Sequence, residues 1–148
     1  MALSTFGAIM GYAAEIVKQT EETYQGLVPK AKSPTLKQVL QDLAGEEKKN
    51  QSLMERTRRE NVTEMILEPI TGLHQEEYEV DLTEMAQKND GDLVKVALVL
   101  EERAKRFFRD ASAKVPLPEV ARTFRKVGQK KEENIVKLQN LGLRQTLG

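Results

Sequence analysis

The chain has 148 residues, enough to bury one hydrophobic core, and its 23 lysines and arginines balance its 23 aspartates and glutamates. Zero net charge gives no global reason to expect nucleic acid or an anionic membrane as a partner. The absence of cysteine excludes disulfides, thiolate metal sites and a catalytic cysteine, and it fits a cytoplasmic location. Glu15 and Lys18 interrupt the apolar start, so neither a signal peptide nor a membrane span is expected.

The first half of the chain predicts a helical hairpin. Apolar residues recur at steps of three and four over about 4–28, which is the pattern of an amphipathic helix. A second helix is predicted to begin at Ser33 and Pro34, an N-cap residue followed by proline at the first helical position. The connection over 29–32 is short, so the two helices are expected to pack antiparallel.

A long connection, roughly 61–90, follows the second helix. It contains Pro69 and Gly72, and short helical turns are expected near 63–67 and 82–87. A helix of about 24 residues is about 36 Å long, and a connection of this length can run back along it. The sequence therefore permits one long crossover between two hairpins.

The second half predicts another hairpin, with helices over about 92–113 and from Pro118 to about 141, before Gly142. The short connection over 114–117 again indicates antiparallel packing. Together the segments predict a single all-α four-helix bundle domain spanning 1–148.

The two halves align without a gap when shifted by 84 positions, the separation of Pro34 from Pro118. The same shift places Asn50 on Asn134, whereas outward positions such as Glu46 differ from their counterparts. Any two amphipathic helix pairs agree in apolar spacing, but matching prolines and asparagines make chance agreement a poorer explanation. The pattern indicates two related hairpins with pseudo-two-fold symmetry.

Polar residues interrupt the predicted apolar faces at mid-helix: Glu47, Asn50, Glu101, Lys131 and Asn134. A slight rotation of each helix would bring any one of them to solvent. Because four of the five coincide in pairs under the repeat, a central polar cluster is the favoured interpretation. Buried charges are costly unless they are paired. The hypothesis is that Lys131 lies between Glu47 and Glu101, with the two amides completing the hydrogen bonding.

A resemblance to a known family rests on three segments. LAGEEKKN at 43–50 is similar to the Leu-Ala-x-Glu-Glu-x-x-His helix of rubrerythrin-like members of the ferritin-like superfamily, and the segment ending at Asn134 looks like its second copy. VLEERAKRFF at 99–108 resembles the other helix type, a Glu followed seven residues later by an aromatic residue, whose place Tyr24 takes in the first helix. The resemblance covers nearly the whole chain. It implies a ferritin-like bundle with a di-iron site that reacts with oxygen or peroxide.

The ligand positions implied by this resemblance are occupied by Val17, Glu47, Asn50, Glu101, Lys131 and Asn134. Only two of these six positions hold a carboxylate, and none holds an imidazole. Lys131 is a cation where the family has an anion. Two metal ions carry about four positive charges, which the family site meets with four carboxylates. No metal cofactor is therefore expected, and any metal that did bind would use Glu47 and Glu101.

Three function classes follow from the resemblance: a non-catalytic structural or interaction bundle that has lost its metal, a rubrerythrin-like iron oxidoreductase with an atypical site, and a binder of a small ligand in the former metal cavity. A homodimer is a further hypothesis, because Leu98 and Ile135 lie off the main apolar stripes. The basic clusters over 56–59 and 103–109 are interpreted as solvated helix faces, and His74 as a surface residue.

Overall fold

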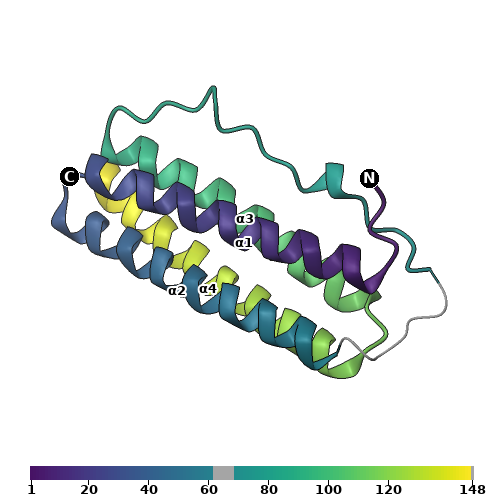
Figure 1. The fold of residues 1–148 in the computed structure, drawn as a ribbon. Coiled ribbons are helices and arrows are strands. Elements are labelled where there is room, and N and C mark those ends of the chain that lie inside the picture. The colour runs from purple at the N-terminus through teal and green to yellow at the C-terminus, as the bar shows by residue number, and fades with distance from the viewer. Residues whose placement is uncertain (62–68, 148) are drawn as a thin grey trace.

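The computed structural model describes residues 1–61 and 69–147. These residues form four α-helices and two single 3₁₀ turns, and they contain no β-strand. The helices are α1 (Phe6–Leu27), α2 (Pro34–Glu60), α3 (Asp90–Lys114) and α4 (Pro118–Leu147). Figure 1 shows them packed lengthwise in one bundle, which confirms the predicted all-α four-helix class. No described helix is long and apolar enough to cross a membrane.

Local capping chemistry explains where three of the helices begin. Thr5, Ser33 and Asn89 each accept a hydrogen bond on the side-chain oxygen from the backbone N–H three residues further on. Each cap satisfies a donor that has no partner within the helix. The cap at Asn89 starts α3 at position 90, two residues earlier than expected. The last helix continues past Gly142 to position 147, since one helical glycine costs only about 1 kcal/mol.

The helices form two antiparallel hairpins, and packing within each hairpin is more extensive than packing between them. One contact fixes how the hairpins are joined: the Asp90 carboxylate accepts hydrogen bonds from the backbone N–H groups of Lys32 (2.9 Å) and Ser33 (2.8 Å). The start of α3 therefore lies beside the start of α2, and the two helices are parallel. The described part of the connection, residues 69–89, runs along the bundle (Figure 1), as expected for a long crossover.

The described part of the crossover differs in detail from the prediction. A single 3₁₀ turn occurs at Gln75–Glu77, while 82–87 contains a bend and no helix. The Asp81 carboxylate accepts hydrogen bonds from both the N–H and the hydroxyl of Thr83, a local pattern that competes with helix formation. The helical turn expected at 63–67 lies outside the described residues.

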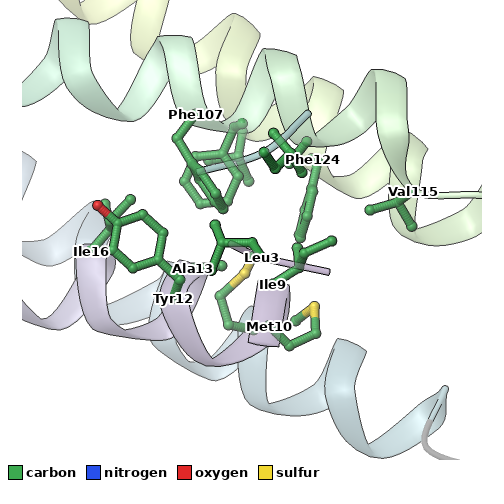
Figure 2. Close-up of a cluster of buried hydrophobic side chains, with 14 of the residues drawn as sticks. Leu3, Ile9, Met10, Tyr12, Ala13, Ile16, Phe107, Val115 and Phe124 are labelled. Atoms are coloured by element: carbon green, nitrogen blue, oxygen red, sulfur yellow. The ribbon is translucent and has the colours of Figure 1, made fainter. Parts of the chain in front are cut away.

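Two clusters of buried hydrophobic side chains fill the bundle. The cluster around the first half of α1 is rich in aromatic side chains, among them Tyr12, Phe107 and Phe124 (Figure 2). The rings of Tyr12 and Phe107 meet edge to face at 5.2 Å, and those of Phe108 and Phe124 at 5.3 Å. The other cluster surrounds the end of α1 and is mainly aliphatic. The space between these two clusters is where the polar residues of the core lie.

Candidate functional site

The polar residues form a layer at mid-bundle, between the aromatic and the aliphatic clusters. On α2, Glu47 stands between Leu43 of the aliphatic cluster and Met54 of the aromatic cluster. On α4, Lys131 stands between Val127 and Leu138, which again belong to different clusters. The helical period brings these polar side chains to the same face as their apolar neighbours. We call the layer formed by Glu46, Glu47, Tyr24, Glu101, Lys131 and Asn134 the ion cluster.

Lys131 occupies the centre of the ion cluster, as predicted. Its side chain is 0% exposed, and its ammonium donates hydrogen bonds to Glu47 Oε1 and to Glu101 Oε2, the latter at 3.2 Å. Glu46 Oε2 lies 3.7 Å from the same nitrogen. Burial alone would lower the pKa of Lys131, but the carboxylates of Glu101, Glu47 and Glu46 outweigh burial and raise it. The lysine is therefore held in its charged form.

Glu101 is the most fully bonded acid of the ion cluster. Its Oε1 accepts a hydrogen bond from Asn134 Nδ2 at 2.8 Å, and its Oε2 accepts one from the Tyr24 hydroxyl at 2.7 Å in addition to that from Lys131. Burial, followed by the charge of Glu101, raises the pKa of Tyr24 well above its usual value. Tyr24 consequently remains a phenol that donates its proton to the carboxylate.

Two positions on α2 differ from the sequence-based prediction. Glu46 was expected to point outward, but its side chain is 17% exposed, and its Oε2 accepts a hydrogen bond from Asn134 Nδ2 at 2.7 Å. Asn50 was expected to be buried and is only half-buried, although it donates to Glu47 Oε1 at 3.2 Å. Residues four apart on a helix share a face, so α2 presents Glu46 and Asn50 together along one edge of the ion cluster.

This layer contains three carboxylates and one ammonium, so negative charge is in excess, and this excess bears on the pKa of Glu47. Burial raises the pKa of Glu47 to about 7, Glu101 and Glu46 add to the increase, and Lys131 opposes it. Near neutral pH, Glu47 is therefore partly protonated. This proton brings the ion cluster closer to charge balance.

The residues at the six positions that the resemblance aligns with metal ligands do not fit a di-metal centre. Val17 is 0% exposed and belongs to the aromatic cluster, so it supplies no ligand atom. The ammonium of Lys131 lies between Glu47 and Glu101, the two remaining carboxylates. Among residues 1–61 and 69–147, no group of three or more His, Cys, Asp or Glu side chains is arranged to hold a metal ion.

A groove of about 570 Å³ lies between α2 and α4, next to the ion cluster. Its lining includes Glu46, Asn50 and Asn134, which belong to or contact the ion cluster, and the charged side chains of Asp42, Lys49, Lys130 and Lys137. A Cβ atom added to Gly45 would meet nothing within 4 Å. The groove thus brings polar groups of the ion cluster close to solvent.

Two further interpretations from the sequence were wrong. Arg103 was assigned to a solvated face but is 5% exposed, whereas Arg106 and Arg109 of the same basic cluster are exposed. Ile135 was proposed to face a second subunit, but it is 5% exposed within the single chain because the buried face of α4 is broad at this level. Leu98 packs partly against the aliphatic cluster. The homodimer therefore remains a prediction without Ile135 as its contact.

Comparison of the chain with known protein families, with curated protein sequences and with solved structures finds no match. The structure itself defines the class of protein: an all-α four-helix bundle with a long crossover and an ion cluster in its core.

Proposed function

We propose that this chain is a rubrerythrin-like member of the ferritin-like superfamily that has lost its di-iron site and serves as a non-catalytic structural or interaction protein. One observation supports the proposal above all others. The ammonium of Lys131 lies between Glu47 and Glu101, the two carboxylates that the resemblance leaves at ligand positions. An organic cation thus neutralises the acids that would otherwise bind metal.

Charge balance gives the physical reason. Glu46, Glu47 and Glu101 together with Lys131 offer at most two negative charges, and a proton on Glu47 reduces the total to one. Two divalent ions carry four positive charges, and buried charge without compensation is strongly unfavourable. Removal of a proton from Lys131 would be needed to free the carboxylates, and its raised pKa opposes that change.

Anaerobic reconstitution with ferrous iron, followed by desalting and elemental analysis, tests the loss of the metal site. We expect close to zero iron per chain and no peroxide consumption above the buffer level. One or two irons per chain would refute the proposal and favour the rubrerythrin-like oxidoreductase. A quadruple variant restores the family's ligand types and supplies the positive control: Val17→Glu, Asn50→His, Lys131→Glu and Asn134→His. Iron retained by this variant alone would show that Lys131 and its neighbours prevent binding.

The groove beside the ion cluster favours a second candidate, the binding of a small ligand. Its volume of about 570 Å³ lies within the range of small-molecule sites. Glu46 Oε1, at the edge of the ion cluster, is buried and has no hydrogen-bond partner. Native mass spectrometry of freshly purified protein would detect a retained small molecule, and Gly45→Leu would fill the open space and displace it. A molecule that is present in the native protein and lost from the Gly45→Leu variant would support ligand binding. If the native protein carries no such molecule, the structural or interaction protein remains the favoured candidate.

A further inference from the structure

Arg103 on α3 is a buried cation that has no ion-pair partner among the described residues. Arg103 is 5% exposed, its Nη2 donates a long hydrogen bond of 3.3 Å to the Thr20 hydroxyl, and its guanidinium also interacts with the Tyr12 hydroxyl. Its Nε is buried and has no hydrogen-bond partner. None of the ion pairs in the described part of the chain includes Arg103.

This environment is unusual for arginine. Buried arginines are normally paired, since a guanidinium removed from water loses hydration that only an anion and several acceptors can replace. Burial lowers the pKa of Arg103 from its usual value, and the nearby Tyr12, Glu47 and Tyr24 offset only part of this effect. The charge nevertheless stays on the guanidinium at neutral pH, because arginine is not deprotonated in proteins. An anion from outside the chain would complete its coordination.

A cavity of about 360 Å³ lies at the position where such an anion could bind. It is formed by α1, α3 and the crossover segment, which Figure 1 shows running along the outside of these helices. Arg103 contributes to its wall. Val80 and Leu82 from the crossover and Leu100 from α3 contribute apolar side chains to the same lining.

The polar part of the lining indicates the charge of the ligand. Gln19 and Thr23 of α1 line the same cavity as Arg103 and add an amide and a hydroxyl to its wall. Glu22, an exposed acid, also lines the cavity and disfavours ions with more than one negative charge. A planar carboxylate matches the guanidinium fork better than a spherical anion does.

We propose that this cavity binds a small monocarboxylate with a short aliphatic chain. The carboxylate accepts hydrogen bonds from Arg103, and the aliphatic chain packs against Val80, Leu82 and Leu100. Arg103 is then a binding residue, and the crossover segment contributes the specificity for an apolar tail. The inference uses no residue of the ion cluster that carries the proposed function, so either can fail while the other holds.

Calorimetric titration with hexanoate, acetate, hexanol and hexylamine tests the ligand class. Hexanoate is expected to bind saturably at one site per chain and acetate more weakly, whereas hexanol and hexylamine should not bind measurably. In ¹⁵N-labelled protein, hexanoate should also shift the Arg103 Nε–H resonance. Absence of saturable hexanoate binding, or equally tight binding of hexanol, would overturn the proposal.

Variants test the assigned contacts. Arg103→Met should weaken hexanoate binding by about tenfold or more, the usual effect of losing a charge-assisted hydrogen bond. Arg109→Met, an exposed arginine on the same helix, is the matched control and should leave binding unchanged. Val80→Phe should weaken the binding of hexanoate more than that of acetate because it shortens the apolar part of the cavity.

If Arg103→Met does not fold, Arg103→Lys replaces it and should bind hexanoate several-fold more weakly than the wild type, since the lysine ammonium cannot donate the paired hydrogen bonds of a guanidinium. Unchanged hexanoate binding in the Arg103 variants would contradict the assignment.

Discussion

Substitution of Lys131 by methionine is the most direct test of the ion cluster. Methionine has similar length and no charge, so it preserves the volume while removing the ammonium that contacts Glu46, Glu47 and Glu101. The three carboxylates are then left in the core with the hydrogen bonds of the amides and Tyr24 as their remaining compensation. The expected result is a folded but strongly destabilised bundle.

The magnitude follows from the burial of the residues involved. Lys131 and Glu101 are both 0% exposed and Glu47 is 1% exposed, so screening by solvent is slight. Removing one partner of a buried ion pair costs about 3–5 kcal/mol. In a domain of this size each kcal/mol corresponds to about 2–4 °C, which predicts a decrease in melting temperature of about 6–20 °C.

Thermal and urea denaturation followed by circular dichroism would measure this change. Lys130→Met is the matched control, because the Lys130 side chain is 56% exposed and its loss should alter stability by less than about 1 kcal/mol. Adding Glu101→Gln to the Lys131→Met variant removes one stranded charge and should restore part of the stability. The destabilisation should be smaller at pH 5 than at pH 8, since the stranded carboxylates take up protons at low pH. Equal melting temperatures for Lys131→Met and Lys130→Met at pH 8 would refute a buried, charged cluster.

Three further predictions concern individual contacts. The pKa of Glu47 is raised from its model-compound value of 4.5 to about 7 in the folded state, so the native state binds the extra proton. The wild type should therefore lose stability relative to Glu47→Gln as pH rises from about 4.5 through 7. Urea titrations of both proteins at pH 5 and pH 8 would measure this loss of stability. A stability difference between them that does not change with pH would contradict the raised pKa of Glu47. Tyr24→Phe should cost about 1.5–3 kcal/mol through loss of a buried hydrogen bond to a carboxylate. Tyr12→Phe loses a 3.4 Å hydrogen bond to the Gln75 carbonyl and the interaction of the hydroxyl with Arg103, and it should cost less because no carboxylate is involved. The reverse order of melting temperatures would be evidence against the cluster. Asp90→Asn should destabilise by about 1–3 kcal/mol because its carboxylate joins the two hairpins, whereas the exposed Asp42→Asn should have little effect in the same denaturation assay.

The sequence by itself determined the number of helices and the way they are connected. Apolar periodicity marked all four helices, and Ser33 followed by Pro34 marked the start of α2 correctly, because capping and proline preferences act within a few residues. The matching of the two halves also predicted which polar positions turn inward. Lys131 and Glu47 occupy equivalent positions of the repeat, and they meet in the core as partners of opposite charge.

Finer features of the site depended on contacts between segments far apart in the chain. Periodicity gives the centre of a buried face but not its width, so Glu46 was placed outside the core and Asn50 too far inside it. Tyr24 was identified as an aromatic position, yet its hydrogen bond to Glu101 requires α1 and α3 to be adjacent.

Arg103 illustrates the same limit most clearly. In sequence it belongs to a basic run with acidic neighbours, which is the pattern of a solvated face. Its burial arises because the packing of α1 on α3 and the path of the crossover enclose that part of α3. Local sequence therefore determined the helices and their polar interruptions, whereas only the tertiary structure decided which charges are neutralised inside the chain and which are left without a partner. Neutralisation depends on distances between residues of different helices, and no local pattern encodes those distances.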